Sequence, residues 1–189
     1  MIKKIKDFIA PSEEEKKVVL LDPAALGGPQ EPDLRIVGLF SDVNEEKIAE
    51  VLHNMLFFNA VNLQSEEKDK QPITFYISTY GGNADDMFAM YDMMRNIRDT
   101  TEIHTVGLGK VMSAGVLMLA AGTKGHRYIG KNCRVMIHSV MGGNHGSLHN
   151  MMNEMEAIEQ LQDMYCDALI SETRLTRVKL KNMLERKVY

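Results

Sequence analysis

The stretch "GKVMSAGVLMLAAG", residues 109–122, is the most informative part of the sequence for the fold. It places one serine between a short polar segment and a run of apolar and small residues. Residues 113–121 are apolar or small nearly all round, which is typical of a helix enclosed in a core. Gly122 is a common C-terminal stop for such a helix. Ser113 stands at the helix start, where serine is a favoured N-cap residue. The same position also suits a nucleophile, and this stretch alone leaves both roles open.

Strand and helix patterns alternate on both sides of Ser113. We expect strands at 33–40, 73–79, 102–109, 125–130 and 134–139, and helices at 42–58, 83–99, 113–121, 149–173 and 177–187. Asp42 lies three residues before Glu45, the spacing of a capping box. The order β-α-β-α-β-α-β predicts an α/β fold with a parallel sheet and helices over its faces.

Composition and length exclude several classes of protein. With 189 residues, 44% hydrophobic residues and 25% charged residues, the chain suits one folded domain. A net charge of −4 argues against a nucleic-acid partner. There is neither a secretory signal nor an apolar run of roughly 18 residues, so we expect a soluble protein with no membrane partner.

Candidate metal ligands are not apparent in the sequence. Cys133 and Cys166 are far apart and form no paired-cysteine motif, which indicates free thiols. The chain has 15 methionines, and those in helical segments suit adaptable packing better than metal binding. The sequence therefore predicts no metal site.

Two segments differ from the compact part of the chain. Residues 1–32 contain Lys/Glu runs and turn formers, so we expect a separate N-terminal segment before a domain at 33–189. The helix at 149–173 has only one narrow apolar stripe. A helix so lightly anchored could reach a partner subunit.

Three features converge around Ser113, and each has a plainer explanation. Gly81-Gly82 at a strand end can leave N–H groups free for a developing charge, although a glycine pair is more often a simple turn. Ala114 offers an unpaired N–H at the helix start. His138 follows the apolar run "RVMI", although five other histidines compete for any role. Parallel sheets bind ligands at their carboxyl edge, so these groups could form the parts needed for acyl transfer.

Three ordered segments carry a resemblance to a known family: "YISTYGGNADDMFAMYDMMR" (76–95), "GLGKVMSAGVLMLAAGTKGHRYIGKNCRVMIHS" (107–139) and "MGGNHG" (141–146). Together they resemble the proteolytic subunit of the Clp protease, ClpP, from about Leu34 to Leu169. The resemblance implies an α/β fold of the ClpP/crotonase type, with stacked βαβ units and a protruding handle helix. It also implies an ATP-dependent serine endopeptidase that cleaves unfolded polypeptides inside a self-compartmentalised ring.

The resemblance assigns roles to individual residues. Ser113 matches the nucleophile and His138 the base, while the N–H groups of Gly81 and Ala114 match the oxyanion hole. Gly142 and Gly143, within residues 140–147, match the glycine-rich strand that aligns peptide substrates by main-chain pairing.

Partners are implied in the same way. The helix from about His149 matches the handle through which two heptameric rings stack into a tetradecamer. Residues 1–32 match the family poorly, whereas in the family this region lines the axial pore and engages a Clp-type ring ATPase. That unfoldase would consume ATP, so this chain needs no cofactor. We expect a cytoplasmic protein, because the sequence shows neither a secretory signal nor a membrane-spanning run.

The chain departs from the family pattern at the site. Tyr80 stands in place of the proline of the S-P-G-G motif, Ser139-Val140 replace Gln-Pro, and Lys187 stands at the position of the orienting aspartate. A lysine cannot accept the imidazole N–H, and either Asn182 or Asp167 could substitute.

These departures leave two alternatives to an active peptidase. One is a catalytically weak or inactive ring subunit with a structural or regulatory role. The other is acyl-CoA chemistry on the related crotonase fold, which needs no serine-histidine pair and is disfavoured because both residues are present.

Overall fold

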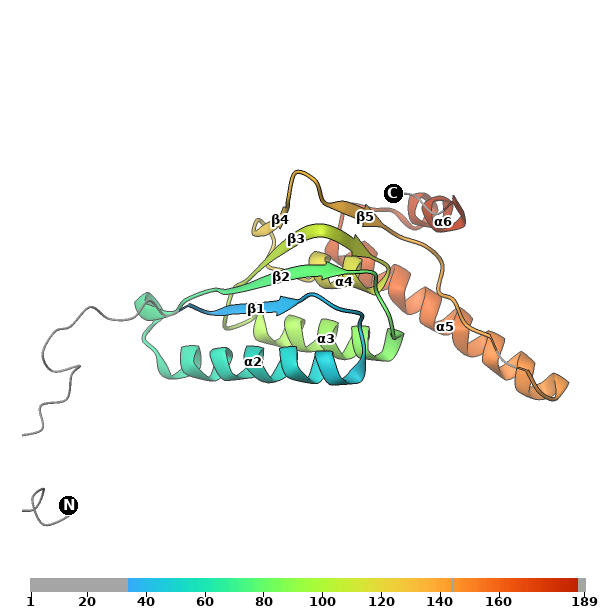
Figure 1. Ribbon diagram of the computed structural model, residues 1–189, viewed down its shortest axis with the longest axis horizontal. Helices are drawn as coiled ribbons and strands as arrows, with labels where there is room; N and C mark the ends of the chain where they lie inside the picture. The colour runs from blue at the N-terminus through green and yellow to red at the C-terminus, as the bar shows by residue number, and fades with distance from the viewer. Residues whose placement is uncertain (1–33, 144, 187–189) are drawn as a thin grey trace, which may run out of the picture. The chain divides into compact units, whose positions relative to one another are not determined.

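The computed structural model describes residues 34–143 and 145–186, which form an α/β fold (Figure 1). The elements in chain order are β1 (Ile36–Leu39), α2 (Glu45–Gln64), the 3-10 helix η2 (Glu67–Asp69), β2 (Ile73–Thr79), α3 (Ala84–Ile97), β3 (Ile103–Met112), α4 (Ala114–Ala120), β4 (Arg127–Ile129), β5 (Arg134–Met136), α5 (Leu148–Glu172) and α6 (Arg177–Arg186). The expected N-terminal segment at 1–32 and Lys187 lie outside the described residues.

All strand pairs of the sheet are parallel, as the alternating pattern predicts. The order is β1-β2-β3-β4, and β5 pairs with β3 further along. Gly107 aligns with Ile129 of β4, whereas Val111 aligns with Val135 of β5, so β4 and β5 follow one another along β3. Gly109 lies between the two pairings with φ 61°, a backbone angle that favours glycine. The third strand therefore continues to Met112, directly before Ser113.

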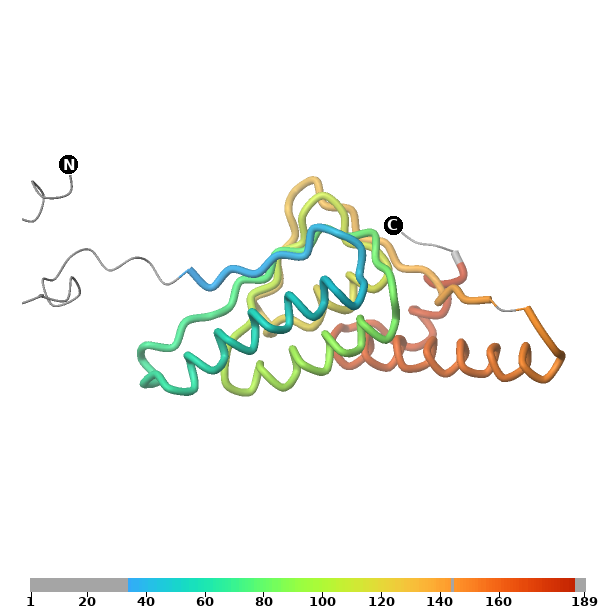
Figure 2. The backbone as a smooth tube through the Cα atoms, turned by 60° about the horizontal axis from the view of Figure 1, so that its bottom comes forward, coloured from blue at the N-terminus to red at the C-terminus, as the bar shows by residue number. Residues whose placement is uncertain are grey.

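The helices α2, α3 and α4 lie on one face of the sheet (Figures 1 and 2). The expected helices over the sheet are therefore present, and these three cover the same face. The strand order explains this arrangement: each new strand is added on the same side of the last, and right-handed crossovers then place every connecting helix on the same face. The opposite face keeps exposed apolar side chains, such as Ile36 and Leu108.

The core lies between the sheet and these helices. Alternate residues of β2 point into it, and Phe75 and Ile77 have no exposed surface. Met55, Met90 and Met94 are equally buried, so packing is the role of these methionines. Both cysteines are free, and Cys133 is only half-buried.

The start and end of α2 differ from the expectation. The N-cap is Asn44, whose side chain accepts the N–H of Lys47 at 3.0 Å, rather than Asp42. The helix continues to Gln64 instead of ending near residue 58. Its polar last turns read as a loop, but Asn62 has no exposed surface and donates to Thr101 Oγ1 at 2.9 Å. A satisfied buried amide thus extends the helix where hydropathy alone indicates a loop.

Candidate active site

Ser113 has an unusual backbone conformation. Its φ is 52° and its ψ is −122°, and among the described residues other than glycine no other has a positive φ. Such a conformation costs a non-glycine residue about 1–3 kcal/mol and persists only where the surrounding structure holds it. Strained strand-to-helix turns expose the nucleophile in hydrolases of the α/β type.

The hydroxyl of Ser113 is not used as a helix cap. The side chains of Asn44, Asn83 and Ser147 accept backbone N–H groups at the starts of α2, α3 and α5. By contrast, Ser113 at the start of α4 makes no side-chain cap hydrogen bond. The interpretation of Ser113 as a side-chain helix cap is therefore wrong, and its Oγ atom does not bond the first turn of α4.

Backbone and side-chain partners hold Ser113 in place. Its N–H donates to the carbonyl of Met136 at 2.9 Å, and its carbonyl accepts the N–H of Val116 at 3.0 Å. The carbonyl also accepts the hydroxyl of Tyr165 at 3.1 Å. Burial raises the pKa of Tyr165 well above its ordinary value, so this hydroxyl stays a proton donor. A strand, a helix turn and a buried tyrosine from α5 thus fix the orientation of Ser113.

Gly81 lies directly against Ser113. A Cβ added at Gly81, where φ is 103°, would sit 2.6 Å from Ser113 Cβ and 3.1 Å from Ser113 Oγ. The next residue, Gly82, is enclosed from the other side, because its added Cβ would sit 2.1 Å from the carbonyl oxygen of Val43. The glycine pair is therefore required by close approach on both sides, not only by a turn.

Ser113 and His138 line one cavity of about 380 Å³ at the carboxyl edge of the sheet. The wall also includes Ala114 and Gly142, as expected, whereas Gly143 is not part of it. An added Cβ at Gly143 would meet no atom within 4 Å. The structure therefore brings together Ser113, Ala114, His138 and Gly142, with Gly81 packed behind the serine.

His138 lies two residues beyond the end of β5, which stops at Met136 rather than at residue 139. Its ring is half-buried and has no hydrogen-bond partner in the part of the chain that the structure describes. Neither expected substitute for the acid reaches the cavity: Asp167 pairs with Arg177, and Asn182 is exposed on α6. The carboxylates that do line the cavity belong to Asp85 and Glu154.

The two N–H groups expected to form the oxyanion hole, those of Ala114 and Gly81, differ in whether they already donate a hydrogen bond. Ala114 is the first residue of α4, so its N–H has no acceptor in a preceding helical turn. The Gly81 N–H instead donates to Thr79 Oγ1 at 3.0 Å. Gly81 would have to exchange this acceptor for an oxyanion.

The expected substrate-binding strand at 140–147 is not formed. The described residues of this range have no strand structure, and the Val140 N–H donates to Gln162 Oε1 of α5 at 2.7 Å. A strand needs a neighbour, and no edge of this chain's sheet lies alongside the segment.

Two functional contacts escaped the sequence analysis. Thr79 falls there only within the expected strand at 73–79, and Tyr165 falls only within the expected helix at 149–173. Their hydroxyls contact backbone groups of Gly81 and Ser113, which lie far from Tyr165 in sequence. The sequence gives one signal for the Tyr165 contact: a tyrosine lies on the narrow apolar stripe of the helix, and a buried tyrosine hydroxyl needs a hydrogen-bond partner.

Comparisons with known proteins agree on one family. A family model described as Clp protease matches residues 32–189. A curated relative from Mesostigma viride, named ATP-dependent Clp protease proteolytic subunit, is 28% identical over 152 residues, or 80% of this chain. The chain spans 63% of the length of that relative.

Proposed function

The chain belongs to the Clp protease family, and we propose that it is a Clp-type serine endopeptidase subunit with Ser113 as nucleophile. The conformation of Ser113 carries this proposal. A strained serine, whose hydroxyl caps no helix, shares a cavity with a histidine that has no partner among the described residues.

The reaction would be acyl transfer in two stages. Ser113 Oγ attacks the carbonyl carbon of the scissile peptide while His138 takes the hydroxyl proton. The negative oxygen that forms is stabilised by the N–H of Ala114 and, after release from Thr79, by that of Gly81. His138 then gives the proton to the leaving amine, and water hydrolyses the acyl group from Ser113. No cofactor is needed in this chain.

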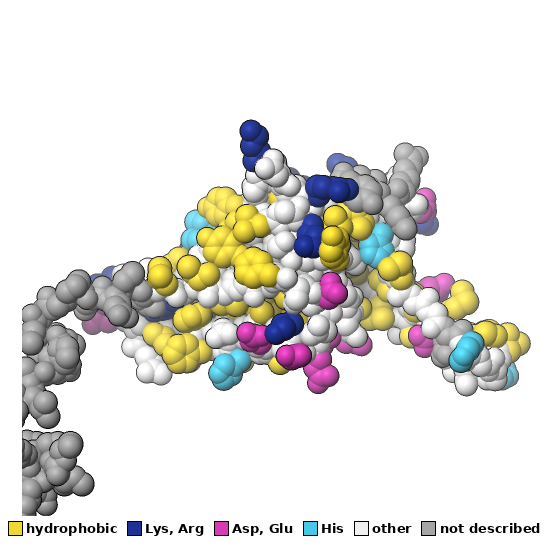
Figure 3. Space-filling model, viewed as in Figure 1, with side chains coloured by type: hydrophobic (Ala, Val, Ile, Leu, Met, Phe, Trp, Pro, Cys, Tyr) yellow, Lys and Arg dark blue, Asp and Glu magenta, His cyan; other side chains and the backbone are white. Residues whose placement is uncertain are grey.

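Assembly into rings is the second part of the proposal. Exposed apolar side chains gather on the side of the strands opposite α2 and α3 and again along α5 (Figure 3). On α5 these are Leu148, Met151, Met152, Met155 and Met164. Surfaces of this kind are typical of interfaces between subunits. We expect heptameric rings, stacked in pairs through α5, with a Clp-type ring ATPase that delivers unfolded polypeptides.

The cellular location is part of the same proposal. None of the helices in the described part of the chain is both long and apolar enough to cross a bilayer. We expect the subunit to work in the cytoplasm beside its ATPase.

Hydrolysis of a fluorogenic peptide by the assembled protein tests the mechanism. Ser113→Ala and His138→Ala should each lower kcat by about 10⁴-fold or more. The matched controls Ser41→Ala and His53→Ala change a serine and a histidine away from the cavity and should retain wild-type rates. Full activity in Ser113→Ala would contradict the proposal. Assembled rings without any hydrolysis would instead support a structural or regulatory subunit.

Position 187 offers a second test. If the lysine there occupies the place of the orienting acid, Lys187→Asp should raise kcat/KM by about tenfold or more, because a carboxylate can hold the imidazole of His138. Lys187→Gln is the matched control, since it removes the positive charge without adding a carboxylate. Equal rates in the two variants would show that position 187 does not supply the acid.

A further inference from the structure

Three potential metal ligands meet at the amino end of β3, far from Ser113. Glu102 immediately precedes β3, His104 is its second residue, and His126 immediately precedes β4. Thr105 pairs with Arg127, so His104 and His126 are neighbours across the two parallel strands. Glu102 and His104 are two residues apart, a spacing that places both side chains on one face.

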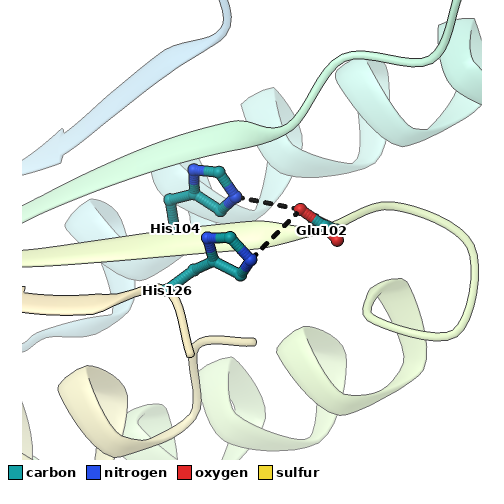
Figure 4. A group of neighbouring side chains, drawn as sticks. All are labelled: Glu102, His104 and His126. Atoms are coloured by element: carbon teal, nitrogen blue, oxygen red, sulfur yellow. Dashed lines mark hydrogen bonds and ion pairs between the residues drawn. The ribbon is translucent and has the colours of Figure 1, made fainter. Parts of the chain in front are cut away.

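The geometry points to a single centre between these groups (Figure 4). The Nε2 atom of His104 lies 3.0 Å from Glu102 Oε2, and the Nε2 atom of His126 lies 3.9 Å from the same oxygen. The two imidazoles are stacked, with centroids 4.2 Å apart and planes 6° apart. Both rings therefore present a nitrogen toward one carboxylate.

These separations suit a tetrahedral metal ion. Two ligands that each lie about 2 Å from a zinc ion are separated by about 3.3 Å at a tetrahedral angle. The observed 3.0 Å and 3.9 Å lie on either side of that value. One potential ligand atom from each of the three residues lies within 4.8 Å of the other two, so small side-chain rotations would let them hold one ion.

We propose that Glu102, His104 and His126 bind a divalent first-row transition metal ion such as Zn²⁺. Two imidazoles and one carboxylate favour such an ion over Mg²⁺, which prefers oxygen ligands. The bound ion would link the start of β3 to the start of β4 and leave a coordination position open to water. Sequence spacing did not reveal this site, because His126 reaches the other two residues only through strand pairing.

The site is separate from the proposed catalytic centre. His104 is the second residue of β3, whereas Ser113 follows the last residue of β3, so the two lie at opposite ends of the strand. Metal binding at this cluster therefore does not depend on the peptidase mechanism, and either proposal can fail alone.

Isothermal titration of the metal-free full-length protein with Zn²⁺ tests the proposal. We expect one ion per chain and a dissociation constant that rises by about tenfold or more in Glu102→Gln, His104→Ala and His126→Ala. His53→Ala and His138→Ala should bind as tightly as wild type, and Mg²⁺ should give no signal. Zn²⁺ should also raise the Tm of wild type but not that of the His104→Ala/His126→Ala double variant.

Two results would overturn the assignment. One is wild-type protein that binds Zn²⁺ no more tightly than the double variant. The other is binding that survives in the double variant but disappears in His138→Ala, which would place the ion in the cavity beside Ser113.

Discussion

Single residues around Ser113 show how close packing excludes even a methyl group. Gly81 combines a positive φ with a backbone that touches Ser113, so it serves both geometry and packing. The N–H that it contributes is held by Thr79 in the described state. Gly81 therefore affects both the position of the Ser113 hydroxyl and the backbone N–H group that lies beside it.

Gly81→Ala should disturb both the fold and the site. The added methyl would clash with Ser113 Cβ at 2.6 Å and with the carbonyl oxygen of Met112 at 3.0 Å. We expect a loss of about 1–3 kcal/mol in the free energy of unfolding, together with loss of peptide hydrolysis. Urea unfolding followed by circular dichroism measures the first effect.

Gly143→Ala is the matched control for stability, because an added Cβ there meets nothing within 4 Å. Its unfolding free energy should stay within about 0.5 kcal/mol of wild type. Equal stability of the Gly81 and Gly143 variants would contradict the close approach of Gly81 to Ser113.

At the scale of elements, one buried carboxylate joins several parts of the fold. Glu172 at the end of α5 is 5% exposed and accepts hydrogen bonds from Arg98 at 2.9 and 3.0 Å. Arg127 of β4 donates to the same carboxylate at 3.1 Å and to the Glu172 carbonyl at 2.6 Å. Arg98 also donates to the carbonyl of Ala121, just after α4. The end of α3, α4, β4 and α5 are thus joined at one point.

Glu172→Gln should cost about 3 kcal/mol in the free energy of unfolding at neutral pH, because it leaves two partly buried guanidinium groups without their counter-charge. Urea unfolding measures this cost. Burial alone raises the pKa of Glu172, but hydrogen bonds and charge from Arg98 and Arg127 outweigh burial and lower it overall.

The lowered pKa fixes the sign of the pH dependence. A carboxylate whose folded pKa is depressed stabilises the fold above the ordinary glutamate pKa of about 4.3 and loses that effect as the pH falls toward the folded value. The difference between wild type and Glu172→Gln should therefore shrink below about pH 4.3. A difference that stays constant or grows on acidification would contradict the role assigned to this carboxylate.

Elements also show what the sequence could predict and where it could not. Periodicity placed β2 at its observed bounds, because every second side chain of residues 73–79 is buried. It failed at α2, where buried Asn62 reads as a loop residue. The family resemblance, rather than periodicity, implied the strand at residues 140–147, and a resemblance does not show whether a neighbouring strand is available to pair with it.

Some residues of the candidate site could also be predicted from the sequence, and others could not. Ser113, Gly81 and His138 were found from local patterns and the family resemblance. The contact of Tyr165 with Ser113 and the position of His126 beside His104 depend on residues that only folding brings together.

At the scale of the whole molecule, the exposed methionines of α5 predict how subunits associate. Met152 and Met155 are 59% and 64% exposed, and burying such side chains stabilises an interface by roughly 1.5–3 kcal/mol each. Met152→Glu/Met155→Glu should therefore lower the mass measured by size exclusion with light scattering, from a double ring to a single ring or smaller species.

Asn153→Asp is the matched control, because it adds a charge to an exposed position of α5 without removing an apolar side chain. It should keep the wild-type mass. A wild-type protein that is monomeric at micromolar concentration would contradict the proposed assembly.

Labelling of the assembled protein with a fluorophosphonate probe tests the central claim most directly. The probe reacts with an activated serine, and mass spectrometry of the digested protein locates the adduct. We predict one adduct, on Ser113, that is absent from Ser113→Ala and strongly reduced in His138→Ala. Absence of an adduct on Ser113 in assembled wild-type protein, or equal labelling with and without His138, would contradict the claim that this strained serine is an activated nucleophile.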